Sequence, residues 1–153
     1  MSALLLERHF FTRVELNSDP DGKPGTVPRV VCYLNIGKAE NDTRRYQVTL
    51  KVEIDREEDE STKPCYTGLI EAVGFFRVQN SYKEDPDKFV HVSGASLLYG
   101  SVREIVCNLS ARGPWPMVTL PTLNFTPQKA ADSVVPEEQS TVVANRKLVS
   151  DSS

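Results

Sequence analysis

Residues 46–55 read YQVTLKVEID, and every second side chain in this stretch is apolar or aromatic. Successive side chains of an extended strand point to opposite faces, so the apolar set lies on one face and the polar set on the other. This alternation is typical of an antiparallel sheet with one face on a core and the other in water. The stretch therefore predicts that the core of the protein rests on one face of an antiparallel sheet.

Two further strands are predicted on either side of this one along the chain. Residues 30–36 form a short apolar run before it. Residues 66–78 form a longer run after it, in which Gly68 and Gly74 indicate a bulge or a close backbone approach. Residues 17–28 are rich in turn and breaker signals, so they form a long connection from a first strand to residues 30–36.

That first strand, predicted over residues 4–16, has apolar side chains on both faces. Its even positions are apolar apart from Arg8 and Thr12, while Phe11 lies among the odd positions. The even-numbered apolar set is Leu4, Leu6, Phe10, Val14 and Leu16. A strand of this kind has more apolar surface to cover than one core requires.

One long helix is predicted over residues 95–111. Ser93 is placed as its N-cap, and Gly113, followed by Pro114, is placed to end it. Apolar side chains recur at helical spacing, and this stripe consists of Leu98, Val102, Ile105 and Leu109. The stripe is suited either to cover the sheet or to contact a second helix.

After the helix, residues 114–125 are apolar, but their three prolines block a regular helix or a central strand. Residues 126–153 have no aromatic side chain and are rich in Ser, Val and charge, which predicts a disordered or loosely held end. We therefore expect one domain over residues 1–125 and a polar tail over residues 126–153.

The composition suits a single soluble globular domain, with 153 residues, 39% hydrophobic and 25% charged. The net charge of −3 argues against nucleic-acid binding, which needs clustered Lys and Arg. No apolar run approaches the roughly 20 residues of a membrane helix. The apolar run at residues 3–6 lacks the basic front and the length of a secretory signal, so we expect a cytosolic protein.

The residue types that carry catalysis or hold metals are not grouped in this sequence. His9 and His91 are isolated, and the three cysteines form no C-x-x-C pair. The acidic run at residues 57–60 is typical of a solvated loop. A Gly-rich phosphate loop and a Gly-x-Ser-x-Gly elbow are both absent. We expect no catalytic residue, no metal site and no required cofactor.

Apolar side chains are in surplus at residues 30–36 and 115–125. Both segments are hard to bury fully under a small sheet with one helix. Two interpretations stand: the segments complete the core, or they form a groove or a subunit interface.

Residues 96–125 carry a set of short motifs in a fixed order. An apolar and aromatic stretch is followed by Val-Arg-Glu at residues 102–104, by SARGPWP at residues 110–116 and by PTLNF at residues 121–125. Each motif alone is weak, but together they resemble SecB, the bacterial protein-export chaperone. The predicted strands also fit that family, so the resemblance covers roughly residues 4–125.

The resemblance implies an α+β fold, a four-stranded antiparallel sheet with one long helix packed on it. It also implies a homotetramer, a dimer of dimers whose helices meet, with the helical stripe at that contact. Unfolded chains are then expected in apolar grooves near the long connection and the segment after the helix. The predicted groove residues are Val31, Tyr33, Trp115, Met117, Leu120 and Phe125.

The resemblance predicts an ATP-independent holdase that binds unfolded preproteins for export. Family members that serve the SecA motor carry acidic residues on one sheet surface, and Glu15 and Glu71 are the candidates here. The segment after Phe125 departs from the further amphipathic helix that such members commonly carry. A second hypothesis is therefore a dedicated chaperone of one partner, such as an antitoxin. A third is a small-ligand-binding α+β domain that uses the same groove.

Overall fold

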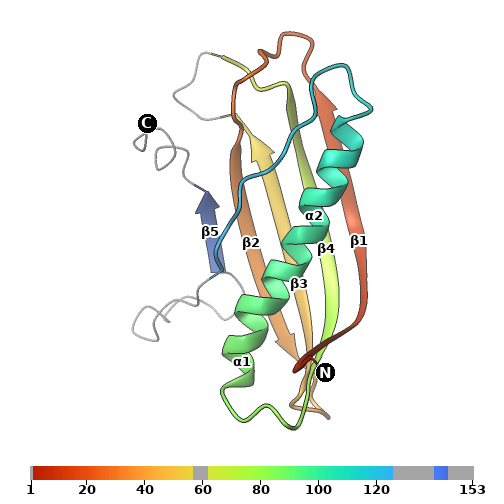
Figure 1. Ribbon diagram of the computed structural model, residues 1–153, viewed down its shortest axis with the longest axis vertical. Coiled ribbons are helices and arrows are strands. Elements are labelled where there is room, and N and C mark those ends of the chain that lie inside the picture. The colour runs from red at the N-terminus through yellow and green to blue at the C-terminus, as the bar shows by residue number, and fades with distance from the viewer. Residues whose placement is uncertain (1, 57–61, 126–139, 145–153) are drawn as a thin grey trace.

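The computed structural model describes residues 2–56, 62–125 and 140–144. A single antiparallel sheet is crossed on one face by a long helical segment (Figure 1). Its elements are β1 (Leu4–Ser18), β2 (Arg29–Lys38), β3 (Arg45–Asp55), β4 (Tyr66–Val78), α1 (Pro86–Phe89), η1 (Val90–Gly94), α2 (Ala95–Ser110) and β5 (Ser140–Ala144). The acidic run at residues 57–60 lies outside the described residues.

The strands are ordered β1-β4-β3-β2-β5, and every neighbouring pair is antiparallel. The predicted α+β fold, with four antiparallel strands and one long helix, is confirmed. The fifth strand, β5, belongs to the tail for which the sequence predicts a disordered or loosely held end, and it pairs with β2. The other tail residues lie outside the described part of the chain.

β1 pairs with β4 along its whole length, but its register shifts twice, at Glu7 and at Thr12. Each bulge inserts one residue and so reverses the alternation of side chains that follows it. As a result Phe11 packs against the core, whereas Phe10 lies on the other face beside Phe75, with 6.2 Å between ring centroids. The predicted even-numbered apolar face is therefore wrong at these two positions.

The long helix α2 begins at Ala95, as predicted, but the helical segment also extends back through η1 and α1 to Pro86, which the sequence analysis did not predict. Asp85 is its N-cap, because its carboxylate accepts a hydrogen bond from the Asp87 amide at 3.0 Å. Ser93, the predicted N-cap, lies inside the π-helical turn η1. A π-helical turn breaks the 3.6-residue spacing, so the apolar pattern of α2 does not extend back to the true start.

Replacing Asp85 with alanine is expected to lower the free energy of unfolding by about 1 kcal/mol, because the first turn loses its side-chain cap. Urea denaturation at fixed protein concentration measures the change. Lys83→Ala, also on the exposed connection before the helix, should stay within about 0.5 kcal/mol of the parent. Equal losses in both variants would show that the cap contributes nothing.

The core lies between the sheet and α2. Leu98, Tyr99, Val102 and Val106 on the helix share one buried cluster with residues of β2, β3 and β4. The segment after the helix returns beside α2 and closes this cluster (Figure 1). Two of the hydrogen bonds that attach it come from side chains of α2: Tyr99 Oη donates to the Pro121 carbonyl at 2.6 Å, and Arg103 Nε donates to the Leu120 carbonyl at 3.1 Å.

Candidate functional site

An apolar groove lies at the end of the sheet where α2 ends, and we call it the crossover groove. Its volume is about 200 Å³. Its walls come from the β1–β2 connection, the start of β4 and the segment after α2. The lining residues are Pro24, Gly25, Thr26, Val27, Pro28, Pro64, Cys65, Tyr66, Pro116, Met117, Val118 and Thr119.

One wall, the β1–β2 connection, is held to the chain just before β4 by backbone hydrogen bonds. The Asp19 amide donates to the Cys65 carbonyl, and the Lys23 amide donates to the Lys63 carbonyl, both at 2.9 Å. Gly22 passes so close that a Cβ there would lie 2.6 Å from the Cys65 Cα. The wall is therefore positioned by backbone contacts and leaves its side chains free to contact a ligand.

The opposite wall, after α2, is organised around the Tyr66 hydroxyl. This hydroxyl accepts a hydrogen bond from the Trp115 amide at 3.1 Å and donates one to the Ser110 carbonyl at 3.2 Å. The fully buried Ser110 hydroxyl accepts the Val118 amide at 2.9 Å. A Cβ at Gly113 would lie 2.1 Å from the Tyr66 hydroxyl, so this glycine permits a close approach. Gly113 has no positive φ, so the predicted glycine helix cap is wrong.

Trp115 joins the two walls. Its indole Nε1–H donates to the Asp19 carbonyl of the β1–β2 connection at 2.8 Å, while its own amide is bound by Tyr66. The ring is half-buried, so it supports the groove rather than lining it. Trp115 therefore fixes the distance between the walls.

The groove presents two exposed apolar side chains. Met117 is 57% exposed and Val27 is 46% exposed. Burial, with a smaller effect from Asp19, raises the pKa of the Cys65 thiol, so this sulfur stays protonated and unreactive. Within the described ranges, no cluster of His, Cys, Asp and Glu could hold a metal ion. A volume of this size accepts one or two side chains of an extended peptide.

The predicted groove residues fall into three places. Trp115 and Met117 belong to the groove or its wall. Leu120 and Phe125 are fully buried in the core. Val31 and Tyr33 lie on the other face of the sheet, because their neighbours in β2 point into the core under α2. Sequence reasoning missed Val27, although its place in a breaker-rich connection already indicated an exposed apolar side chain.

The predicted oligomer stripe is divided by the fold. Leu98 and Val102 are buried in the subunit's own core, Ile105 is half-buried and Leu109 is 39% exposed. Outward from α2 the chain presents Leu97, which is half-exposed, and Gly100, which has open space beyond it. A helix–helix contact would therefore use this outer side.

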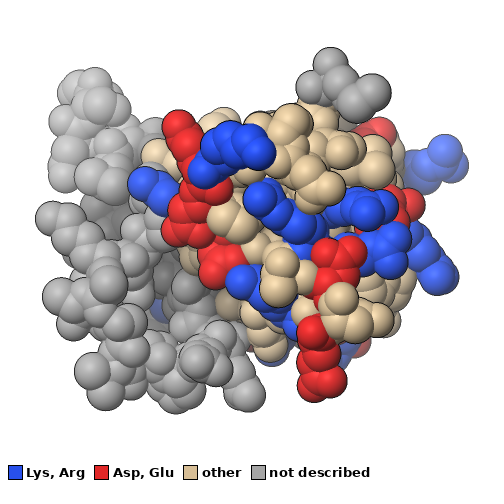
Figure 2. Space-filling view, turned by 90° about the horizontal axis from the view of Figure 1, so that it is seen from below, with Lys and Arg blue, Asp and Glu red and all other residues tan. Residues whose placement is uncertain are grey.

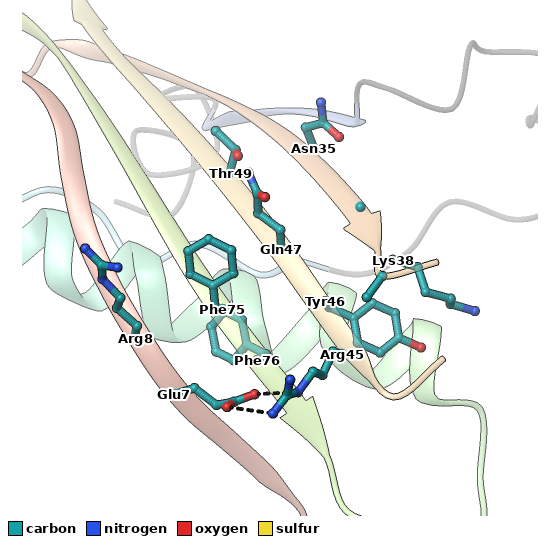
Figure 3. Close-up of a pocket in the computed structure, with 12 residues that line it drawn as sticks. Glu7, Arg8, Asn35, Lys38, Arg45, Tyr46, Gln47, Thr49, Phe75 and Phe76 are labelled. Carbon is teal, nitrogen blue, oxygen red and sulfur yellow. Dashed lines mark hydrogen bonds and ion pairs between the residues drawn. The ribbon is translucent and has the colours of Figure 1, made fainter. Parts of the chain in front are cut away.

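The sheet face away from α2 carries a broad hollow of about 730 Å³ (Figure 3). Phe75 of β4 and Gln47 of β3 lie within it, and Arg8 of β1 lies at its side (Figure 3). Glu7 and Arg45 form an ion pair at 3.4 Å across it. The hollow thus combines the half-buried ring of Phe75 with charged side chains at its sides.

Charges are also interleaved at the end of the molecule opposite the crossover groove (Figure 2). There Lys38 Nζ forms an ion pair with Asp87 Oδ1 at 2.9 Å, and Arg45 Nε forms one with Asp42 Oδ2 at 3.7 Å. Lys38 and Arg45 are therefore each paired with a carboxylate at this end.

The two predicted acidic residues, Glu15 and Glu71, share the face of the sheet away from α2. Glu15 is paired with Arg13 at 2.9 Å. Glu71 accepts a hydrogen bond from the Thr12 hydroxyl at 2.6 Å and stands opposite Lys51 in the sheet. Glu15 is therefore in an ion pair, whereas Glu71 is held by a hydroxyl hydrogen bond.

Comparison with known proteins identifies the family of this chain. The family described as "Preprotein translocase subunit SecB" matches residues 17–128. A search of curated proteins found no match. None of the described helices has the length and apolar character needed to cross a membrane.

Two solved structures are similar to this chain. One is a SecB-like chaperone from Mycobacterium tuberculosis in complex with an antitoxin peptide. It is 17% identical, with a TM-score of 0.58, over 80% of this chain and 91% of that one. The other is a protein of unknown function from Streptococcus agalactiae, 13% identical with a TM-score of 0.46, over 78% and 97% of the two chains. With most of its length matched by the family and its fold shared with a SecB-like chaperone, the chain belongs to the SecB family.

Proposed function

We propose that this protein is an ATP-independent holdase that binds unfolded polypeptide segments in the crossover groove. Membership of the SecB family supports a chaperone role. The observation that carries the proposal is the exposure of Met117 and Val27 on the two walls of the groove. Hydrogen bonds of Trp115 with Asp19 and Tyr66 fix the positions of these walls. A holdase needs apolar attraction with little shape selectivity, and a flexible thioether beside an aliphatic side chain provides it.

Preproteins in the cytoplasm are the first class of client, because the family description refers to preprotein translocation. The second is one dedicated partner, as in the mycobacterial chaperone that was solved with an antitoxin peptide. Glu15 is engaged by an ion pair with Arg13, and Glu71 is engaged by a hydrogen bond from Thr12, which favours the dedicated role. Affinity capture from cells separates the two: many exported precursors with SecA support export, and one dominant partner supports dedication.

Aggregation of a chemically unfolded protein tests the holdase directly. The purified chain, without nucleotide, is expected to delay aggregation at a several-fold molar excess over the unfolded client. No delay with any of several unrelated clients would overturn the proposal. A single small molecule that raises the melting temperature sharply, without any effect on aggregation, would instead support a ligand-binding domain.

Assembly is expected to be a homotetramer built as a dimer of dimers. β1 has 15 residues and lies at one edge of the sheet, where no described strand covers its outer side. Such an edge pairs readily with another chain, and the outer side of α2 offers Leu97 for a second contact. Multi-angle light scattering is expected to give four times the 17.1 kDa of one chain. A monomer at micromolar concentration would contradict this prediction.

A further inference from the structure

The tail of this chain lies along the edge of β2. Ser140–Ala144 runs antiparallel to β2, with Ala144 opposite Val30 and Ser140 opposite Leu34 (Figure 1). The chain thus adds one of its own segments to the sheet by main-chain pairing. Main-chain pairing depends little on side-chain identity, so the same edge is suited to many extended sequences.

The β2 edge leads directly into the crossover groove. Residues 24–28 line the groove, and β2 begins at Arg29 immediately after them. A strand that runs antiparallel on β2 leaves the edge at Val30, on the side where the groove begins. One extended peptide can therefore occupy the edge and continue into the groove.

Side chains beside this edge also suit an extended peptide. Val31 and Tyr33 project from β2 on the face away from α2, and the Tyr33 ring lies 5.3 Å from the Lys51 ammonium. The buried Arg29 Nε has no hydrogen-bond partner among the described residues. It is a spare donor between the edge and the groove, available to a peptide carbonyl.

We propose that the β2 edge is a docking site for extended polypeptide and that Ser140–Ala144 is its built-in competitor. The proposal rests on the holdase function and adds the main-chain half of the site. A client that pairs with β2 and also fills the groove makes contacts that β5 alone does not make. Such a client displaces β5, whereas a weak or short segment does not.

β5 competes effectively because it belongs to the same chain as β2. A segment joined to the same chain has an effective concentration of about millimolar, so β5 covers the edge without binding it tightly. The apparent affinity for a client is then reduced by the fraction of molecules whose edge is open. Removing β5 from the edge should raise client affinity and leave the groove unchanged.

The test compares two variants of the full chain, Val142→Pro/Val143→Pro and Val142→Ala/Val143→Ala. Successive residues of a strand direct their N–H groups alternately toward and away from a neighbour, so the proline pair removes a ladder donor whichever residue supplies it. The alanine pair keeps both N–H groups. Binding of a fluorescent, reduced and carboxymethylated client is expected to be at least about threefold tighter for the proline pair, and within about twofold of the parent for the alanine pair.

A synthetic peptide of residues 138–146 provides the second measurement. It should bind the proline pair, restore hydrogen-exchange protection to the β2 amides, and weaken client binding as its concentration rises. If the proline pair binds the client as tightly as the parent or more weakly, Ser140–Ala144 does not compete with clients. If the peptide does not bind that variant, the β2 edge is not a docking site for extended polypeptide. If neither the parent nor the proline pair binds any client while the peptide still protects β2, the holdase function fails and the edge stands.

Discussion

The double substitution Met117→Glu/Val27→Glu is expected to weaken binding of an unfolded client at least tenfold. Each apolar side chain removed from water on binding contributes up to about 1.5–3 kcal/mol, and 1.4 kcal/mol corresponds to a factor of ten. The charged replacements must also be desolvated when the client binds, which adds to the loss. Fluorescence anisotropy with a labelled, permanently unfolded protein measures the affinity.

The fold should tolerate this change, because both side chains are largely exposed and neither belongs to the core cluster. Met117→Leu/Val27→Ile is the matched control, since it keeps the groove apolar, and it should bind within about twofold of the parent. Unchanged binding by the glutamate pair would place the client elsewhere. The face away from α2, with Tyr33 and Phe75, would then be the next surface to test.

The sheet was predictable because its signals are local. Residues 46–55 alternate strictly, and they form β3, whose apolar side chains are all buried. The β1 pattern was harder to interpret, since two bulges reverse the facing of its side chains partway along the strand. Nothing local marks Glu7 as a bulge, whereas Thr12 already interrupts the apolar alternation. Pairing with β4 determines which of Phe10 and Phe11 enters the core.

The helix illustrates a different limit. Its apolar spacing is clear in α2, but the π-helical turn shifts the phase of the pattern before Ala95. Asp85 followed by Pro86 is a strong helix start, yet a long helix starting there would have needed one unbroken apolar stripe. Tertiary burial of Val90 in the core continues the helix through this turn.

The sequence predicted which segments lie at the groove, but it did not predict which of their residues line it. The groove is lined by the connection before β2, which the family resemblance implied, and by the segment after α2, where apolar side chains are in surplus. Residue type alone could not separate Met117, which points outward, from Leu120, which is buried. That division depends on two hydrogen bonds from α2, donated by Tyr99 and Arg103, that draw the later part of the segment onto the core.

Phe125→Ala is expected to lower the free energy of unfolding by about 3–5 kcal/mol, the usual cost of removing a buried aromatic ring. Phe125 is fully buried, and its ring meets Tyr99 edge-on with 5.6 Å between centroids. Urea denaturation at fixed protein concentration measures the loss. Met117→Ala, from the same segment, should stay within about 0.5 kcal/mol of the parent.

This pair of variants separates two roles within one apolar segment. If Phe125 lined a client groove instead, its removal would weaken client binding and leave unfolding almost unchanged. The core position predicts the reverse: a less stable protein whose remaining folded fraction binds clients with normal affinity.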